Sequence, residues 1–203
     1  MINTKYVLAT ANPGKVKEMR EILTKIGINV LTRSDLGIDI KVQETGTTFE
    51  ENALLKAKAI CEATNLPAIA DDSGLCIDAL GGAPGLYSSS FGGDELSDKE
   101  RCDYLLNLLK NVKQRTAKFV STIACAFPDG KTVLARGECN GKIATEPHGE
   151  NGFGYDPVFY AGGSDVTLAQ IPADEKNAIS HRGKALREFS RLLTENNINT
   201  TGE

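Results

Sequence analysis

Apolar residues recur along the chain at two spacings, and these predict alternating strands and helices. Short apolar runs bounded by turn residues predict strands at 6–9, 29–32, 68–70, 75–80, 119–127 and 132–138. Apolar residues three to four positions apart predict helices that begin near residues 13, 48, 97 and 180. Pro128-Asp129-Gly130 joins two of the strands and is typical of a hairpin turn, and Asn140-Gly141 is a second turn signal.

Polar residues at the predicted helix starts are of the types that cap helices. Asn12 precedes a proline, and this pair suits the N-cap and the first helical position. Thr48 is followed three residues later by Glu51, as a capping box requires, and Ser97 and Glu100 repeat the spacing. These signals support the helix boundaries that the apolar pattern predicts.

The order of the elements predicts the fold class. Strands and helices alternate in the first half of the chain, whereas hairpins dominate later. This order predicts an α/β fold with a mixed central sheet, flanking helices and two lobes around a cleft. A length of 203 residues fits a single domain over residues 1–203. The segment 196–203 is expected to be a frayed tail.

Composition excludes several classes of protein. Apolar residues make up 40% of the chain and charged residues 25%, which is ordinary for a globular protein and excludes a fibrous or largely disordered chain. No apolar run approaches the roughly 18 residues of a membrane span. The net charge of −4 comes without a basic block, so polymeric nucleic acid is not an expected partner.

Cysteine use and the start of the sequence indicate the compartment. The five cysteines are odd in number, widely spaced and without a CxxC motif, which is typical of reduced thiols in a cytosolic protein. The polar N-terminal residues lack the layout of a secretory signal. We therefore expect a cytoplasmic protein. His148 and His181 are too few and too far apart for a zinc site on their own.

The first candidate for chemistry lies between the first strand and the first helix. It comprises Thr10, Ala11, Asn12, Pro13, Gly14 and Lys15. A helix N-terminus presents unpaired N–H groups and a partial positive charge, which suit a phosphate, and Lys15 can add a full charge. The segment is not a P-loop, because GxxxxGK[ST] is absent. A well-capped helix with a solvated lysine is the alternative explanation.

The second candidate is Asp71-Asp72-Ser73-Gly74, which follows a buried-type strand. Two adjacent carboxylates before a glycine turn invite Mg²⁺. Neighbours in a strand point to opposite faces, so one of the two should face the site unless the turn has begun. The alternative is a β-turn in which Asp and Ser bond their own backbone. Glu44 could supply another oxygen ligand, and Lys56 could reach a phosphate if its helix face lines the cleft.

Two later segments can hold a flat, polar ligand. Gly152-Phe153-Gly154-Tyr155-Asp156-Pro157 offers an aromatic face, glycines for close approach and a carboxylate that could accept a base N–H. Ser180-His181-Arg182 starts a helix, and Arg182 can donate twice to a carbonyl edge or a phosphate. The alternatives are an aromatic core with glycine turns, and a capped helix with surface charge.

Seven segments, taken together, resemble the inosine triphosphate pyrophosphatase family, also called the XTP/dITP diphosphatases. They occur in the family's order and span residues 6 to about 193, so the combination is far more specific than any one segment. They are Thr10-Ala11-Asn12-Pro13-Gly14-Lys15, Glu44-Thr45-Gly46, Phe49-Glu50-Glu51-Asn52-Ala53 with Lys56, Ala70-Asp71-Asp72-Ser73-Gly74-Leu75, Gly81-Gly82-Ala83-Pro84-Gly85, Gly152-Phe153-Gly154-Tyr155-Asp156-Pro157 and Ser180-His181-Arg182-Gly183.

The resemblance implies an elongated α/β fold with two lobes and a homodimer. It implies hydrolysis of non-standard purine nucleoside triphosphates (ITP, dITP and XTP) to the monophosphate and pyrophosphate, with Mg²⁺ as cofactor, which cleanses the nucleotide pool. By the family's pattern, Thr10 to Lys15 hold the phosphates. Glu44 and Asp72 bind the metal, and Asp72 also accepts the proton. The residues assigned to the nucleotide are Ser73, Phe153, Gly154, Tyr155, Asp156, Lys176, His181 and Arg182. Bacterial relatives often have Arg at the position of Ser90.

The charges then suggest a mechanism. Lys15, Lys56 and Mg²⁺ must neutralise the triphosphate, and Asp72 can orient or deprotonate a water that attacks the α-phosphorus. A hydrogen-bond donor that faces the 6-keto oxygen of these purines would face the amino group of adenine instead. Each group left unpaired in this way costs roughly 1–3 kcal/mol of binding free energy. A non-catalytic nucleotide-binding module, which needs no metal carboxylates, is one alternative. A phosphatase that removes the γ-phosphate and releases orthophosphate is another.

Overall fold

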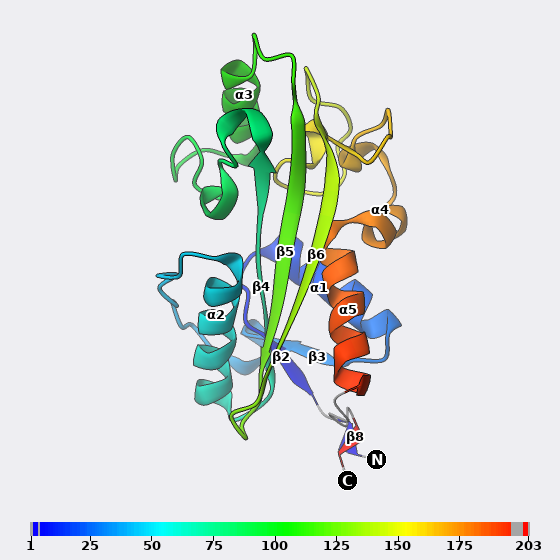
Figure 1. Ribbon diagram of the computed structural model, residues 1–203. Coiled ribbons are helices and arrows are strands. Elements are labelled where there is room, and N and C mark those ends of the chain that lie inside the picture. Colours follow the sequence, from blue (N-terminus) through cyan, green and yellow to red (C-terminus); the bar gives the residue numbers. More distant parts are fainter. Residues whose placement is uncertain (1, 4, 196–200, 203) are drawn as a thin grey trace. The chain divides into compact units, whose positions relative to one another are not determined.

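The computed structural model describes residues 2–3, 5–195 and 201–202, and the chain divides into two compact units (Figure 1). The first unit comprises Met1–Asp72, Ser121–Gly137 and Lys184–Glu203, and the second comprises Ser73–Val120 and Glu138–Gly183. The unit boundaries fall within three long strands, β4, β5 and β6, so each of these strands contributes residues to both units.

Six strands form one sheet in the order β3-β2-β4-β5-β6-β7. Their bounds are β2 Tyr6–Leu8, β3 Val30–Thr32, β4 Ala68–Ile77, β5 Thr116–Ala126, β6 Thr132–Ile143 and β7 Phe159–Ala161. Strand β2 is parallel to both β3 and β4, whereas β6 and β7 are antiparallel, with Gly141 opposite Ala161. The predicted mixed sheet is therefore confirmed.

The helices of the described residues are α1 Pro13–Lys25, α2 Phe49–Thr64, α3 Asp98–Leu108, α4 Ala173–Ile179 and α5 His181–Glu195. Short 3₁₀ turns are η1 Ser34–Leu36, η2 Asp78–Leu80, η3 Gly85–Tyr87, η4 Asp156–Val158 and η5 Leu168–Gln170. In the part of the chain that the structure describes, no helix has the length and apolar character needed to cross a membrane.

The ends of the chain form a small separate sheet. Strand β1, Ile2–Asn3, pairs antiparallel with β8, Thr201–Gly202. Most of the predicted frayed tail, residues 196–200 and 203, lies outside the described residues.

The core of the first unit has two apolar layers, one on each face of its strands. Tyr6 and Leu8 of β2 pack with α1 and α5, whereas Val7 and Ala9, the alternate positions, pack with α2. Figure 1 accordingly shows α2 and α5 on opposite sides of these strands. Alternation along a strand thus decides which helix each side chain meets.

The core of the second unit lies between α3 and the far ends of the long strands. Cys102 and Leu105 of α3 belong to the same buried cluster as Leu75 and Ile77 of β4. Aromatic rings of β5 and β7 complete this cluster, since the centroids of Phe119 and Phe159 are 4.7 Å apart.

The predicted caps are present. The side chain of Asn12 accepts a hydrogen bond from the backbone N–H of Lys15 (3.0 Å), and Ser97 and Glu100 form a complete capping box. Thr48 accepts from the N–H of Glu51 (3.1 Å), but the Glu51 carboxylate reaches back to the N–H of Thr47 instead of the cap residue. These local hydrogen bonds fix where the helices begin.

Two predicted turns are wrong. Asp71-Asp72-Ser73-Gly74 lies inside the continuous strand β4, because a neighbouring loop packs on the strand: the hydroxyl of Ser88 accepts from the N–H of Leu75 (2.8 Å). Asn140-Gly141 lies inside β6, where the glycine allows the neighbouring strand to approach closely. A Cβ on Gly141 would lie 2.0 Å from the carbonyl oxygen of Tyr160. A Cβ on Gly74 would likewise lie 2.1 Å from the carbonyl oxygen of Gly85, so both glycines allow close packing and neither forms a turn.

Other elements also differ from the predictions: β5 begins at Thr116, β6 continues to Ile143, and β7 was not predicted. The strand expected at 75–80 ends at Ile77 and continues as η2. Helix α4 was not predicted, because only seven residues form it and no cap side chain marks its start.

We predict that Gly141→Ala lowers the free energy of unfolding by about 1–3 kcal/mol, because the added methyl group overlaps a backbone carbonyl that cannot rotate away. Gly163→Ala is the matched control, since a Cβ on Gly163 meets nothing within 4 Å. Its effect should stay within about 0.5 kcal/mol. Denaturant unfolding measures both values, and equal effects would contradict the packing role of Gly141.

Candidate functional site

The N-terminus of α1 presents the predicted phosphate segment on the surface of the first unit. Asn12 and Pro13 are exposed there, whereas Thr10 is buried and its hydroxyl accepts from the N–H of Asn12 (3.2 Å). Lys15 lies in the first turn of the helix, and its Nζ is 2.8 Å from the carboxylate of Asp71. The Asn12 cap already accepts from the N–H of Lys15, so the groups that suit an anion here are the positive end of the α1 dipole and the Lys15 ammonium.

Asp71 and Asp72 point to opposite faces of β4. Asp71 shares the face that packs on α1, where Lys15 and the hydroxyl of Ser121 (2.5 Å) both contact its carboxylate. Asp72 shares the face that packs on α2, where Lys56 contacts it at 2.7 Å. The expectation that adjacent strand carboxylates face opposite ways is confirmed, and each one meets a lysine of a different helix.

Glu44, Lys56 and Asp72 form a group that we call the carboxylate–lysine cluster. The Lys56 Nζ lies 2.7 Å from Asp72 and 3.3 Å from Glu44, so both carboxylates converge on one cation. Lys56 and Asp72 are largely buried, whereas the Glu44 side chain is 46% exposed. The cluster therefore has one side open to solvent.

A hydrogen bond ties the Glu44 loop to the start of α2. The N–H of Gly46 donates to Oδ1 of the buried Asn52 (2.8 Å), and a Cβ on Gly46 would lie 2.6 Å from that oxygen. Asn52 lies one helical turn before Lys56, so one helix positions both the lysine and the glutamate loop. The spacing of four residues between Asn52 and Lys56 predicts a shared helix face, but nothing in the sequence indicates the bond to Gly46.

Burial shifts the proton affinities in this cluster. Burial raises the pKa of Asp72 to about 6, even though the charges of Lys56 and Lys15 oppose the shift, and the nearby Glu44 adds to it. Burial lowers the pKa of Lys56, but the charges of Asp72 and Glu44 more than offset this and raise it overall. Lys56 thus stays cationic, and Asp72 is mainly ionised above a pH of about 6 and mainly protonated below it.

The donor set of this cluster fits Mg²⁺. The described residues contain no group of three or more His, Cys, Asp or Glu side chains that could hold a metal ion. Mg²⁺ is usually held by one or two carboxylates together with substrate phosphates. Glu44 and Asp72, which already converge on one cation, provide such a pair.

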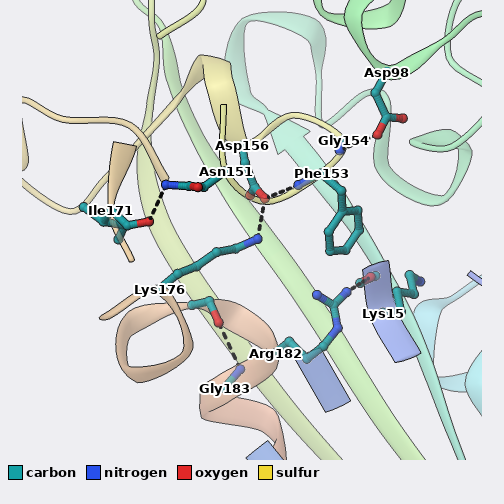
Figure 2. A network of polar contacts seen from close by, with 12 residues as sticks. Lys15, Asp98, Asn151, Phe153, Gly154, Asp156, Ile171, Lys176, Arg182 and Gly183 are labelled. Carbon is teal, nitrogen blue, oxygen red and sulfur yellow. Dashed lines mark hydrogen bonds and ion pairs between the residues drawn. The ribbon is translucent and has the colours of Figure 1, made fainter. Parts of the chain in front are cut away.

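In the second unit, a buried ion pair fixes the loop that carries Phe153 (Figure 2). The Asp156 carboxylate accepts from the N–H of Phe153 (2.8 Å) and from the Lys176 ammonium. Gly152 has a φ of +75°, and a Cβ there would lie 2.1 Å from this carboxylate. Asp156 thus serves the loop itself, and the expectation that it reads a base edge has no support from these contacts.

Two cations lie beside the Phe153 ring, and we call these three residues the aromatic group. The Lys176 Nζ is 4.9 Å from the ring centroid and the Arg182 guanidinium carbon 5.6 Å. Arg182 also donates to the hydroxyl of Ser73 (2.9 Å), the residue after Asp72 in the chain. The half-buried ring with adjacent donors is an arrangement that suits a flat, polar ligand.

The remaining predicted residues have internal contacts. The Tyr155 hydroxyl donates to the carbonyl of Ser88 (2.8 Å), and burial raises the pKa of this phenol. His181 is buried and stacks on Phe119, with ring centroids 4.6 Å apart. The side chains of Tyr155 and His181 therefore contribute to the core of the second unit.

Helix α3 holds the Gly154 backbone through two residues that sequence reasoning missed. The N–H of Gly154 donates to the Asp98 carboxylate (2.7 Å), and its carbonyl accepts from the Cys102 thiol (3.4 Å). Burial raises the pKa of Cys102 to about 12, so the thiol keeps its proton at neutral pH. No local pattern in the sequence connects these residues with a glycine more than fifty positions away.

We predict that Lys56→Met raises the pKa of Asp72 above its value of about 6, because burial persists while the opposing charge is removed. The measurement is the pH dependence of the Asp72 carboxyl ¹³C shift in metal-free protein. The exposed Lys58 on the same helix gives the control, Lys58→Met, which should leave the pKa unchanged. A fall in the Asp72 pKa in Lys56→Met would contradict the electrostatic account.

Comparisons with known proteins identify the family of this chain. The sequence model of the Ham1 family matches residues 6–192. The dITP/XTP pyrophosphatase of Bacillus subtilis is 46% identical over 195 residues, which cover 95% of this chain and 98% of that protein. The dITP/XTP pyrophosphatase of Haemophilus influenzae is 50% identical over 193 residues, which cover 93% of this chain and 98% of that protein.

Solved structures extend the likeness to three dimensions. The Ham1 protein of Staphylococcus aureus is 42% identical and has a TM-score of 0.84, with 95% of this chain and 100% of that chain covered. A Ham1 protein from Coxiella burnetii matches equally well, with a TM-score of 0.84. The predicted α/β fold class and the predicted family are confirmed, and the chain belongs to the Ham1 family.

Proposed function

We propose that this chain hydrolyses non-standard purine nucleoside triphosphates (dITP, XTP and ITP) to the monophosphate and pyrophosphate. The observation that carries the proposal is the carboxylate–lysine cluster. Its Asp72 is the neighbour in β4 of Asp71, which contacts Lys15 at the N-terminus of α1. Relatives at 46% and 50% identity bear the name dITP/XTP pyrophosphatase. The role in cleansing the nucleotide pool follows from these substrates.

The first unit supplies groups for the phosphates. The N-terminus of α1 offers the positive end of its helix dipole, and Lys15 and Lys56 contribute two ammonium groups, each paired with a carboxylate, to a protein whose net charge is −4. Local positive charge is needed because the triphosphate is strongly anionic and the protein as a whole is acidic. These charges can stabilise the pyrophosphate as it leaves.

Asp72 is the proposed proton acceptor. In the metal-free protein its raised pKa of about 6 leaves it ionised at neutral pH and more basic than an ordinary aspartate, which suits a group that takes a proton from a water attacking the α-phosphorus. The hydroxyl oxygen of that water forms the new bond to phosphorus, the bond to the bridging oxygen breaks, and pyrophosphate leaves. Mg²⁺, which Glu44 and Asp72 would hold, supplies further charge neutralisation at the phosphates when bound.

The aromatic group offers contacts that suit a purine. The Phe153 ring offers a face for stacking, and Lys176 and Arg182 provide donors beside it. A donor that meets a 6-keto oxygen would leave adenine, with an amino group there, less favoured. The side chains of Tyr155, Asp156 and His181 act indirectly in this proposal, because their described contacts hold the loop and the core.

The experiment that tests the proposal measures both possible inorganic products. Purified protein is incubated with dITP and Mg²⁺, and pyrophosphate and orthophosphate are quantified separately. Release of pyrophosphate and the monophosphate is expected. Release of orthophosphate and dIDP would instead indicate a phosphatase acting on the γ-phosphate, and binding without any product would indicate a nucleotide-binding module. The homodimer and the cytoplasmic location expected from the sequence stay predictions.

We predict that Asp72→Asn lowers kcat for dITP by about 10²–10⁴, the usual contribution of a general base, while the melting temperature shows a folded protein. Asparagine keeps the shape of the side chain but loses its charge and basicity. Asp39→Asn, at a fully exposed carboxylate, is the control and should leave kcat unchanged. A near-normal rate in Asp72→Asn would remove Asp72 from the mechanism.

We further predict that two variants of the aromatic group separate stacking from base reading. Stacking is worth ~1–3 kcal/mol and every base has a π-face, so Phe153→Ala should lower kcat/KM for ITP, XTP and GTP by similar factors. Arg182→Ala should instead shrink the ratio of kcat/KM for ITP over ATP, because a donor is lost. Equal losses for ITP and ATP in Arg182→Ala would assign Arg182 to a phosphate or structural role.

A further inference from the structure

A buried serine of β5 contacts the carboxylate that holds Lys15. The Ser121 hydroxyl donates to Oδ1 of Asp71 at 2.5 Å, and Oδ2 of the same carboxylate lies 2.8 Å from the Lys15 Nζ. Both Ser121 and the Asp71 side chain have no exposure to solvent. The three residues thus form a chain of contacts that runs from the sheet interior to the first turn of α1.

The position of Ser121 is otherwise apolar. Ile123 and Cys125, which follow it at alternate positions of β5, pack in the cluster that joins this face of the sheet to α1. A hydroxyl in such surroundings is stable only when it is hydrogen-bonded. The contact with Asp71 meets that need and assigns each oxygen of the carboxylate to a different donor, so the carboxylate cannot rotate freely.

The Asp71 carboxylate also offsets the electrostatic repulsion between Lys15 and the N-terminus of its own helix. A cation in the first turn of a helix lies at the positive end of the helix dipole and is disfavoured there. The ion pair with Asp71 offsets this repulsion and keeps the ammonium beside the exposed N-terminus. The orientation of Lys15 therefore depends on the orientation of the Asp71 carboxylate.

We propose that Ser121 is a positioning residue for the phosphate-binding function of Lys15: by fixing Asp71, it holds the Lys15 ammonium where a polyphosphate would meet the α1 N-terminus. This inference rests on the proposed function, in which Lys15 contacts the phosphates. Ser121 itself touches no substrate. Asp71 is then the residue of the Asp71–Asp72 pair that prepares phosphate binding, and Asp72 the one that acts on water.

The test measures binding of inorganic tripolyphosphate by calorimetry in the presence of Mg²⁺, with four proteins: wild type, Ser121→Ala, Lys15→Met and the double variant. Ser121→Ala should weaken binding about tenfold, as loss of a supporting contact commonly does. In the Lys15→Met background the same change should have less than about a twofold further effect, because coupled residues are not additive. Pyrophosphate release from dITP is measured on the same proteins.

A neighbouring residue provides the matched control. Thr122 follows Ser121 in β5, is equally buried, and faces the other layer, where its hydroxyl contacts Glu50 (3.1 Å). Thr122→Val should change tripolyphosphate binding by less than about twofold. Ser121→Cys, which keeps the size of the side chain with a weaker donor, should give an intermediate loss and covers the case in which Ser121→Ala does not fold.

The outcomes separate the inference from the proposed function. Equal losses from Ser121→Ala with and without Lys15, or no loss in either, would overturn the positioning role even if wild type releases pyrophosphate. A tenfold loss that disappears in Lys15→Met would support it. If wild type released no pyrophosphate while this binding pattern held, the proposed reaction would fail and the positioning role of Ser121 would stand.

Discussion

Strand β4 carries one carboxylate to each of its faces, and the proposed chemistry depends on this alternation. Asp71 meets Lys15 of α1 on one face, and Asp72 meets Lys56 of α2 on the other. An ionised carboxylate buried without a partner would be strongly destabilising, so each lysine is required by its aspartate. Two neighbouring residues of one strand thus fix a lysine from each helix, both within the first unit.

The different surroundings of the two aspartates give them different chemistry. Asp71 is enclosed and contacts Lys15 and Ser121, so its carboxylate serves to hold other groups. Asp72 belongs to a cluster with one open side, and its pKa of about 6 suits a group that exchanges a proton near neutral pH. In the second unit, too, a buried carboxylate–lysine pair holds other groups in place, since Asp156 and Lys176 fix the backbone that presents Phe153.

Features that depend on local hydrogen bonds could be predicted from the sequence, whereas those that depend on distant neighbours could not. The caps at Asn12, Thr48 and Ser97 were read correctly because the residues that form them lie within three positions of one another. The glycines of β4 and β6 were read as turns, because their reason for being glycine is a carbonyl on another segment. Short helix α4 carries no cap signal.

The candidate site shows the same division. The charged residues Lys15, Glu44 and Asp72 were identified from their types and positions, and from the resemblance to a known family. Their supporting contacts, such as Asn52 with Gly46, Ser121 with Asp71, and Asp98 with Gly154, join segments that only the folded chain brings together. The expected contact of Asp156 with a base stays a prediction, because the contacts of its carboxylate described here are with the N–H of Phe153 in its own loop and with Lys176 of α4.

In the proposed reaction, a water beside Asp72 attacks the α-phosphorus of the substrate. Hydrolysis of dITP in water enriched in ¹⁸O, followed by mass spectrometry of the products, tests this directly. Attack at the α-phosphorus places the label in the monophosphate and leaves the pyrophosphate unlabelled, which is the predicted result. Label in the pyrophosphate would show attack at the β-phosphorus and would contradict the claim.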